Sequence, residues 1–375
     1  MIIHGDCLDE MKKMEDNSIS AIVTDPPYGL SFMGKGWDHA VPGIEYWREA
    51  FRITKPGGFL IAMGGTRTVH RLCSAIEDAD YEIRDCIMWI YGSGFPKSHN
   101  NYGLAGYGTA LKPAFEPAIL AMKPCDGTFK QNAEKWGQAG INIDACRIPT
   151  DQNLVRPFIP REDNEVFGKG LGAGIQSNPK GRWPANVIFD EEAAKMLDEQ
   201  SGNLKSGKMK EGQNRSSKPL FGSPNDHIHE TIGDSGGASR FFYCAKTSSR
   251  ERNEGLEGMP FLEGGIKNDS GRGFSESNPH KSIQYKNNHP TVKPLKLMRY
   301  LITLIMPPKD GILLDPFAGS GSTIIAAHQL GVKAIGIEKQ AEYVEIANKR
   351  LEYYKDYKDD KEPDLFDQAP TSKTA

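Results

Sequence analysis

The sequence predicts an α/β fold with a mostly parallel, twisted sheet and helices on both faces. Short apolar runs rich in branched residues alternate with segments of helical apolar spacing, as expected when helices connect parallel strands. Several of these runs end at acidic residues, prolines or glycines, and open α/β sheets bind ligands at the carboxyl ends of their strands. At 375 residues the chain is long enough for one large domain with an insertion, or for two domains.

The strongest local signal is a short apolar run, Ala21–Thr24, that ends at Asp25-Pro26-Pro27-Tyr28. Proline can neither donate to a β-ladder nor continue a helix, so the two prolines close the strand with a rigid corner. The corner presents a carboxylate, a backbone carbonyl and a flat aromatic ring. We infer from these groups that it grips an exocyclic amine, and a proline turn with an accompanying acid is the alternative interpretation.

Further strands and helices are expected around this corner. A strand over Ile2–His4 is followed by Asp6, which either meets a ligand or caps the short helix that follows it. A strand over Pro117–Met122 is expected to pair antiparallel at the edge of the sheet. The other predicted elements of this part are helices over Tyr46–Phe51 and Thr66–Ala79 and strands over Phe59–Met63 and Ile83–Tyr91.

Residues 123–288 differ in character, because Gly, Asn, Ser, Lys and Arg dominate and apolar periodicity nearly disappears. A loop-rich stretch of this length inside a compact protein is usually functional or disordered. Between Gly202 and Gly222, five basic residues face the single acid Glu211, a composition suited to phosphates and base edges but shared by solvated loops. The basic residues are Lys205, Lys208, Lys210, Arg215 and Lys218.

The C-terminal part has the pattern of a nucleotide-binding βαβ unit. A strand, a loop with Gly319 and Gly321, and a helix are followed by a second strand that ends at Glu338. The glycines let the backbone approach a ligand, and the acid can accept hydrogen bonds from both ribose hydroxyls. The three-glycine dinucleotide fingerprint and the phosphate-loop ending are both incomplete. Asp315, just before the loop, suits an ammonium group, which S-adenosylmethionine carries and nicotinamide cofactors lack there. Helices are predicted from Leu295 to Ile305 and from Ala341 to Tyr354.

In combination, these motifs resemble those of the amino-methylating DNA methyltransferases of the permuted beta class. Members carry a catalytic Pro-Pro-Tyr motif, then a variable target-recognition region, then an Asp-Pro-Phe-x-Gly-Ser-Gly cofactor motif. These correspond here to Asp25–Tyr28, residues 123–288 and Asp315–Gly321, and the resemblance covers residues 2–351. Segments similar to those accompanying the motifs in the family, several of them in phage-type members, are Gly5-Asp6, Lys55–Gly58, Gly94–Ser98 and His289–Pro294.

The resemblance implies a circularly permuted, Rossmann-like methyltransferase fold with S-adenosylmethionine as cofactor and double-stranded DNA as substrate. Residues 1–122 would form the catalytic half, 123–288 the target-recognition region, 289–354 the cofactor-binding half and 355–375 a disordered tail. The Asp25 carboxylate and the Pro26 carbonyl would accept from the target amine, with Pro27 completing the corner, and Tyr28 would stack on a flipped base. The residues that the resemblance assigns to the cofactor are Asp6, His289, Thr291, Lys293, Asp315, Phe317, Gly319, Gly321, Ser322 and Glu338. Lys97 is a further DNA-binding candidate, in addition to the five basic residues.

Several functions remain open on the sequence. Aspartate at the first motif position is more frequent in adenine-N6 than in cytosine-N4 enzymes of this class, so adenine is favoured and cytosine-N4 is the alternative. Carbon-5 methylation needs a cysteine nucleophile, and Cys125 lacks the partner acid and arginine of such enzymes. RNA or protein-glutamine methyltransferases have a similar corner, but there the cofactor loop precedes it. A catalytically dead DNA-binding protein is the non-enzymatic alternative, and the intact motif residues argue against it.

Composition and charge restrict the partners and the compartment. No apolar run approaches the length of a membrane span, and the N-terminus is unlike a signal peptide, so we expect a cytoplasmic protein of a bacterium or a phage-infected cell. The six cysteines lack metal-ligand spacing, so neither a metal site nor disulfides are expected. The net charge of −3 means that any DNA-binding surface is local.

Members of the class often dimerise, and Pro363–Phe366 resembles the short peptide that docks bacterial proteins on a sliding clamp. Both a restriction–modification role and a phage role fit the sequence.

Overall fold

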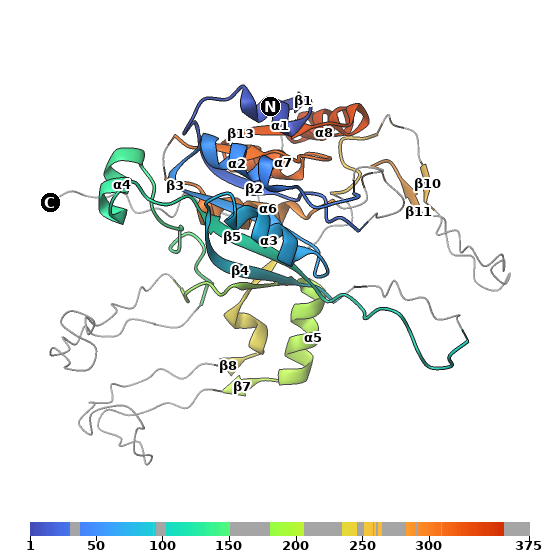
Figure 1. The fold of residues 1–375 in the computed structure, drawn as a ribbon. Helices are drawn as coiled ribbons and strands as arrows, with labels where there is room; N and C mark the ends of the chain where they lie inside the picture. Colours follow the sequence, from blue (N-terminus) through green and yellow to red (C-terminus); the bar gives the residue numbers. More distant parts are fainter. Residues whose placement is uncertain are drawn as a thin grey trace, which may run out of the picture. The chain divides into compact units, whose positions relative to one another are not determined.

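The computed structural model describes residues 1–30, 38–92, 94, 103–150, 181–205, 235–245, 251–257, 259, 262–264, 283–287, 289, 292–308 and 310–355 (Figure 1). The chain divides into two compact units. The first unit comprises Met1–Trp89, Phe115–Ala145 and Ala245–Ala375, and the second comprises Ile90–Ala114 and Cys146–Cys244. The predicted disordered tail lies outside the described residues from residue 356 onwards.

The strands of the first unit form one sheet in the order β1-β13-β12-β2-β3-β5-β4. Strands β1, β13, β12, β2 and β3 are parallel to one another, whereas β5 pairs antiparallel with β3. The mostly parallel sheet predicted from the sequence is therefore confirmed. The strand bounds are β1 (Ile2–His4), β2 (Ile19–Thr24), β3 (Thr54–Met63), β4 (Glu82–Ile90), β5 (Phe115–Met122), β12 (Ile312–Asp315) and β13 (Lys333–Glu338).

Strand β5 is antiparallel as predicted, but the prediction that it lies at the edge of the sheet is wrong. It lies between β3 and β4. Its residues Pro117–Met122 are all buried, and a continuous apolar run of this kind is the pattern of a strand covered on both faces. The position matters for the site, because an antiparallel strand brings its first residues, and not its last, to the edge where the parallel strands end.

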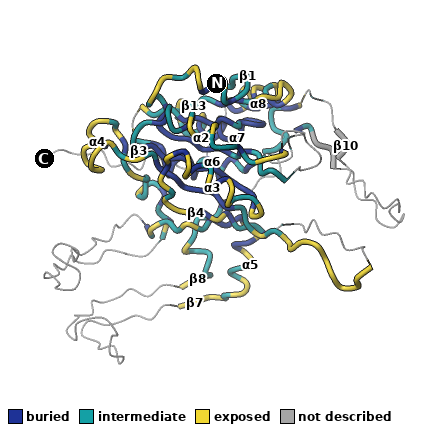
Figure 2. Tube along the Cα trace, in the orientation of Figure 1, coloured by how far each residue is buried: buried dark blue, intermediate teal, exposed yellow. Residues whose placement is uncertain are grey.

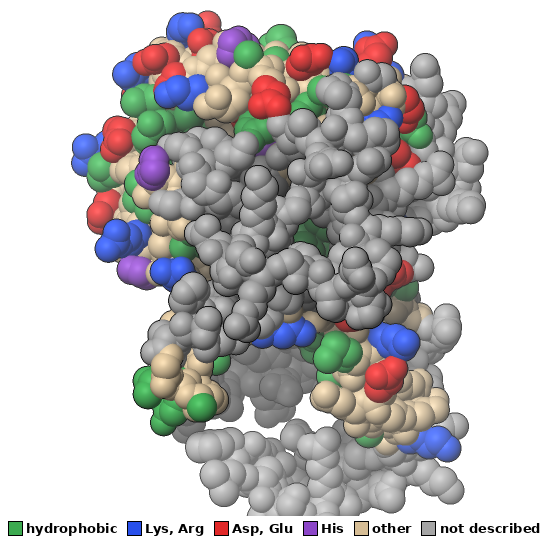
Figure 3. Space-filling view, turned by 90° about the vertical axis from the view of Figure 1, so that its right-hand side faces the viewer, with side chains coloured by type: hydrophobic (Ala, Val, Ile, Leu, Met, Phe, Trp, Pro, Cys, Tyr) green, Lys and Arg blue, Asp and Glu red, His purple; other side chains and the backbone are tan. Residues whose placement is uncertain are grey.

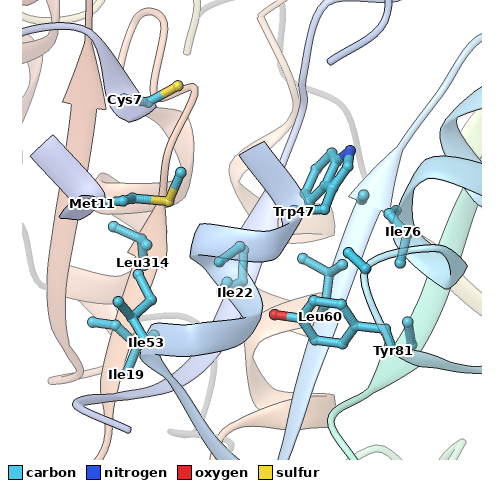
Figure 4. Packing of buried hydrophobic residues seen from close by; sticks show 14 of the residues in the cluster. Cys7, Met11, Ile19, Ile22, Trp47, Ile53, Leu60, Ile76, Tyr81 and Leu314 are labelled. Carbon is cyan, nitrogen blue, oxygen red and sulfur yellow. The ribbon is translucent and has the colours of Figure 1, made fainter. Parts of the chain in front are cut away.

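Helices cover both faces of this sheet (Figure 1). One face packs against α1 (Cys7–Lys12), α2 (Ile44–Ile53) and α3 (Val69–Glu77), and the other against α6 (Leu295–Ile305), α7 (Ser322–Gln329) and α8 (Ala341–Tyr354). In the core beneath α1–α3, side chains from three helices meet alternate residues of the strands, since successive strand residues point to opposite faces (Figure 4). Met11, Trp47, Ile53, Leu60 and Leu314 are among these core residues.

The central strand β2 is buried along its entire length (Figure 2). Two of its residues, Ser20 and Thr24, are polar. Buried polar groups need hydrogen-bond partners, so a polar residue at the end of a central strand indicates a partner nearby. The partner of Thr24 lies on the adjacent strand β12 and forms part of the site described below.

Two helices lie in the region where the sequence predicts few regular elements. They are α4 (Phe129–Trp136) in the first unit and α5 (Glu191–Ser201) in the second. Both begin at strong capping residues: Thr128 forms a capping box with Gln131, and Asp190 accepts a hydrogen bond from the amide of Ala193. The local capping signals were present in the sequence, but the weak apolar pattern of each helix concealed them.

The second unit has a small core of its own, in which Phe189, Ala193 and Ala194 pack with Phe242 and Leu197. Its elements besides α5 are β6 (Val187–Asp190), β7 (Leu204–Lys205), β8 (Ser235–Gly236), η2 (Ala238–Phe241) and β9 (Tyr243–Ala245), whose last residue falls in the first unit. In the first unit, β10 (Leu262–Gly264) pairs antiparallel with β11 (Ile283–Tyr285). Among the helices of the described ranges, none is long and apolar enough to cross a lipid bilayer.

Candidate active site

Four acidic residues lie along one edge of the sheet, each at or just after the end of a parallel strand. Asp6 follows β1, Glu338 ends β13, Asp315 ends β12 and Asp25 follows β2. Because the strands are ordered β1-β13-β12-β2, the acids are arranged along the edge in that same order. The sequence predicted that the strands ending at Asp25 and Asp315 are central and adjacent, and the pairing of Leu314 with Ile22 confirms this.

Asp315 ties the ends of the two central strands together. Its Oδ1 accepts a 2.7 Å hydrogen bond from Thr24 Oγ1 and a 3.1 Å bond from the amide of Phe317, and Thr323 on α7 also donates to this carboxylate. The residue is only 2% exposed. Burial raises the pKa of Asp315 to about 6, although these donors oppose the rise. The Asp315 carboxylate, which was expected to bind an ammonium group, therefore forms its hydrogen bonds mainly with groups of the protein itself.

The corner after β2 contains a cluster of four polar side chains, which we call the corner tetrad: Asp25, Tyr28, Glu116 and Lys293. Lys293 Nζ lies 2.6 Å from Asp25 Oδ2 and 3.3 Å from Glu116 Oε2. The Tyr28 hydroxyl lies 2.8 Å from Asp25 Oδ1 and 2.9 Å from Glu116 Oε2. Lys293 also donates to the Tyr28 hydroxyl at 3.2 Å, so every member contacts at least two others.

Burial and charge act in opposite directions within the corner tetrad. Burial raises the pKa of Asp25, and the Lys293 ammonium lowers it in part. Burial by itself would lower the pKa of Lys293, but the charges of Asp25 and Glu116 outweigh it and the pKa is raised. Burial also raises the pKa of Tyr28 well above its usual range. Lys293 is therefore a stable ammonium and Tyr28 a stable phenol, and both can donate to the carboxylates.

Glu116 was not identified from the sequence, and the sheet explains why. It lies near the start of β5, and Ala118 of that strand pairs with Met63 at the end of β3. Since β5 runs antiparallel, its beginning lies at the edge where β2 and β3 end. A search for acids after strand ends therefore passes over Glu116, and only the strand direction reveals it.

Backbone contacts hold the corner in place. Thr68 Oγ1 donates to the Tyr28 carbonyl at 2.6 Å, and the buried Asp38 accepts from the Gly29 amide at 2.8 Å. A Cβ atom at Gly65 would lie 3.1 Å from the Tyr28 ring, so the absence of a side chain there lets the ring approach. Pro26 is buried while Asp25 and Tyr28 are partly accessible. The corner is thus a rigid support that presents a carboxylate and a ring.

The glycine loop lies at the same edge, between β12 and α7. Gly319 and Gly321 have φ values of +51° and +82°, which favour glycine. Glu338 holds the loop, because its Oε2 accepts from the Gly319 amide at 2.9 Å while its Oε1 accepts from the Gln340 amide at 2.7 Å. A Cβ atom on Gly319 would lie 2.7 Å from His289 Nε2, so loop and imidazole are in close contact.

A buried arginine outside the sequence motifs holds the glycine loop through a hydrogen bond. Arg350 on α8 is fully buried, and its Nη1 donates to the Ser320 carbonyl at 2.6 Å. Its Nη2 lies 3.4 Å from the carbonyl of Glu251. The neighbouring Arg252 donates to the His289 carbonyl at 2.9 Å. The segment around Glu251 therefore braces both the glycine loop and the imidazole beside it.

This edge has the groups that a nucleoside cofactor requires. The Glu338 carboxylate is partly accessible and fixed by backbone amides, so its remaining lone pairs can accept from ribose hydroxyls. The ring of Phe317 packs 6.1 Å from Tyr46 and is partly exposed, which provides an apolar surface beside the loop. Asp6 instead caps α1 through Leu8 and pairs with Lys339 at 3.0 Å, so the capping interpretation describes its contacts here.

The remaining candidates are placed as follows. Lys293, which the resemblance assigned to the cofactor, is a member of the corner tetrad and contacts Asp25 and Tyr28. Lys205 is the exposed last residue of β7 in the second unit. Burial raises the pKa of the Cys125 thiol, the opposite of what an activated nucleophile needs. Ser322 is the buried first residue of α7. The candidates that lie outside the described residues are Lys97, Lys208, Lys210, Arg215, Lys218 and Thr291.

Charge and metal ligands give no competing site in the described part of the chain. Acidic and basic side chains are interspersed on the described surface of the face shown in Figure 3. Within that same part of the chain, no group of three His, Cys, Asp or Glu side chains is arranged to hold a metal ion. The glycine loop and the corner tetrad are therefore the features on which a function can be argued.

The chain belongs to the DNA methylase family (N6_N4_Mtase), which matches residues 19–349. This is the class of S-adenosylmethionine-dependent, amino-methylating DNA methyltransferases indicated by the motifs. The type II methyltransferase M.HindIII of Haemophilus influenzae is 45% identical over 93% of this chain and 94% of its own length. The DNA adenine methyltransferase YhdJ of Escherichia coli is 42% identical over 95% of this chain and 84% of its own length.

Other similarities are shorter or more distant. The chain spans about a quarter of the length of M2.LlaDCHI of Lactococcus lactis subsp. cremoris, with 44% identity over 71 residues, which is 19% of this chain and 26% of that protein. Among solved structures, the cytosine-N4-specific PvuII DNA methyltransferase has a TM-score of 0.48 at 14% identity, covering 98% of this chain and 91% of that chain.

Proposed function

We propose that this chain is a site-specific DNA methyltransferase that transfers the methyl group of S-adenosylmethionine to the exocyclic N6 of adenine in duplex DNA. The observation that carries the proposal is the position of the Asp25 carboxylate. It follows β2, which pairs with β12, the strand that leads into the glycine loop. A group that grips an amine and a loop suited to a nucleoside cofactor thus end adjacent parallel strands.

The Asp25 carboxylate is suited to activate an aromatic amine. The lone pair of such an amine is delocalised into the ring, so acceptors aimed at its hydrogens make it a better nucleophile. Asp25 already accepts an N–H donor, the Lys293 ammonium at 2.6 Å. The Pro26 carbonyl belongs to a peptide that has no amide hydrogen of its own. Tyr28 provides a partly accessible ring on which a base extruded from the duplex can stack.

The cofactor supplies an electrophilic methyl group on a positively charged sulfur. We assign its ribose to Glu338, which is partly accessible, and its closest backbone approach to Gly319, whose amide donates to Glu338 and whose φ is +51°. The contribution of Asp315 is to fix the end of β12 beside β2. We also assign His289 and Phe317 to the cofactor, because His289 lies close to Gly319 and Phe317 is the partly exposed ring two residues after Asp315.

Adenine is preferred to cytosine on two grounds. The first motif residue is Asp25, and aspartate occurs more often there in adenine-N6 enzymes of the class. The relative YhdJ is described as a DNA adenine methyltransferase and matches 95% of this chain. Cytosine-N4 methylation is the alternative outcome. Within the same proposal, residues 123–288 and Lys97 are assigned to target recognition. A dimer is expected from the resemblance, a clamp contact from the peptide Pro363–Phe366, and a cytoplasmic setting from the composition.

The decisive experiment identifies the modified base. The protein is incubated with duplex DNA and isotopically labelled S-adenosylmethionine, and the DNA is digested to nucleosides for mass spectrometry. N6-methyladenine supports the proposal, N4-methylcytosine establishes the alternative, and no labelled base at all overturns it. Single-molecule sequencing of DNA from cells that express the protein then gives the sequence context.

A variant tests the assigned role of Asp25. Asp25→Ala should abolish turnover while cofactor binding, measured by calorimetry, is retained. The exposed residue Asp9 on α1 provides the control Asp9→Ala, which should behave as wild type. An Asp25→Ala protein that methylates DNA at the wild-type rate would contradict the mechanism.

A further inference from the structure

The Tyr28 hydroxyl lies between two carboxylates, and this position has a consequence for protons. Its oxygen is 2.8 Å from Asp25 Oδ1 and 2.9 Å from Glu116 Oε2, so both distances are those of hydrogen bonds. A phenol carries one proton and can donate to only one carboxylate at a time. The second short contact is favourable when the other carboxyl group donates to the phenol oxygen. The three oxygens therefore form a continuous path for a proton.

We propose that the proton lost by the target amine at Asp25 passes through the Tyr28 hydroxyl to Glu116, a proposal that rests on the function proposed above. Glu116 would not touch the substrate and would act through Tyr28. Its role in the reaction is that of a proton-accepting and positioning residue, and it lies near the start of β5, outside both sequence motifs.

The step balances in atoms and charge. The amine nitrogen forms a bond to the methyl carbon while the carbon–sulfur bond breaks with its electron pair remaining on sulfur. As that bond forms, the nitrogen gives up one N–H proton to Asp25 and keeps the electron pair of the N–H bond. Asp25 passes a proton to the Tyr28 oxygen as the phenol gives its own proton to Glu116. Asp25 ends ionised, Tyr28 ends as a neutral phenol, and no further reactant is needed.

The charges around the path favour its end point. A single ammonium group, that of Lys293, faces both carboxyl groups, 2.6 Å from Asp25 and 3.3 Å from Glu116. The charge of Asp25 also contributes to the raised pKa of Asp315 on β12, so the buried carboxyl groups act on one another. Once the proton is on Glu116, Lys293 balances Asp25 alone. Neutralising one of two neighbouring carboxylates in a buried site is favourable.

The direction of the path follows from exposure. The side chain of Glu116 is 25% exposed, whereas that of Asp25 is 14% exposed and that of Lys293 is 6% exposed. Among Glu116, Asp25 and Lys293, Glu116 is therefore the side chain from which a proton reaches solvent most easily. Asp25 thus loses its proton and is ionised for the next turnover, although its own side chain need not contact water.

The test compares Glu116→Gln, Glu116→Asp and Tyr28→Phe in single-turnover methylation of DNA across about pH 5.5–9, a range of about 3.5 units centred near neutrality. Loss of the relay in Glu116→Gln should slow the chemical step by about 100-fold. The KM values for cofactor and DNA should stay close to wild type, and the pH dependence of the rate should change. Glu116→Asp should recover part of the rate, because it restores the proton acceptor.

Two further results separate a relay from a structural role. The double variant with Glu116→Gln and Tyr28→Phe should be no slower than the slower single variant, since both interrupt one path. The exposed Glu82 at the start of β4 gives the control Glu82→Gln, which should match wild type. A Glu116→Gln protein with the wild-type rate and pH profile overturns the relay, and so do strictly additive effects of the two substitutions.

The wild-type protein provides a measurement that does not depend on a variant folding. A proton inventory in mixtures of H₂O and D₂O should curve, because two protons move together, and a linear inventory in the chemical step overturns the proposal. If wild-type protein does not methylate DNA at all, the proposed function fails. If it does and the inventory is linear, only the relay fails, so the two failures are distinguishable.

Discussion

Thr24 Oγ1 donates a 2.7 Å hydrogen bond to Asp315 Oδ1 across the central pair of strands, joining residues 291 positions apart in the chain. Thr24 is the residue before the corner at Asp25, and Asp315 ends the strand that leads into the glycine loop. The two halves of the site are thus connected by a buried bond between side chains as well as by the β-ladder. The geometry of one half depends on the other.

Removing this bond should destabilise the protein. Thr24→Val leaves a buried carboxylate short of one donor, and we expect a loss of about 1–3 kcal/mol in the free energy of unfolding. Urea unfolding at neutral pH measures it. Thr303→Val is the matched control, because the Thr303 hydroxyl on α6 is buried with no partner among the described residues, and its removal should be neutral or stabilising. Equal losses in both variants would contradict the role of the Thr24 bond.

Asp315 should make stability depend on pH. Burial raises its pKa from the ordinary value of 3.8 to about 6, so between about pH 4 and pH 6 the folded protein binds a proton that the unfolded chain has lost. This contribution to stability is present at low pH and is lost as pH rises through about 6. Its full size is about 3 kcal/mol. Asp315→Asn should flatten this part of the profile in urea unfolding from pH 4 to 7, and an unchanged slope would contradict the assignment.

The glycine loop should not accept a side chain at Gly319. Gly319→Ala forces a left-handed conformation on alanine, costing roughly 1–2 kcal/mol, and pushes a Cβ atom to within 2.7 Å of the His289 ring. We expect weaker cofactor binding by calorimetry. Gly331→Ala is the control, since Gly331 has a φ of +67° but nothing within 4 Å of a Cβ atom. It should lose similar stability and keep full cofactor affinity, whereas an equal loss of affinity in both would refute the close contact.

Arg350 should be essential for the shape of the same loop. Arg350→Met removes the 2.6 Å hydrogen bond to the Ser320 carbonyl, and hydrogen bonds to charged groups contribute about 1.5–3 kcal/mol each. Both the free energy of unfolding and the cofactor affinity should fall. The adjacent Lys349 is exposed and pairs with Glu345, so Lys349→Met should change either quantity little. Retention of full cofactor affinity by Arg350→Met would show that the loop does not need this support.

Local signals made much of the fold and part of the site predictable. The run before Asp25 and its two prolines act on adjacent residues, so β2 and its corner could be located from the sequence. The helix predicted over Ala341–Tyr354 has those bounds in the structure, because its apolar period and its boundaries are both local. Helices α4 and α5 escaped prediction because capping residues, and not a strong apolar pattern, define where they start.

The sequence by itself determined the α/β class, the Asp25 corner, the glycine loop and the acid Glu338, because each depends on the chemistry of consecutive residues. Only the tertiary structure decided which of these residues meet. Glu116 reaches the corner because β5 runs antiparallel beside β3, and Lys293 reaches it from the residues just before α6. Strand direction and order depend on packing between distant segments, and no local pattern encodes them.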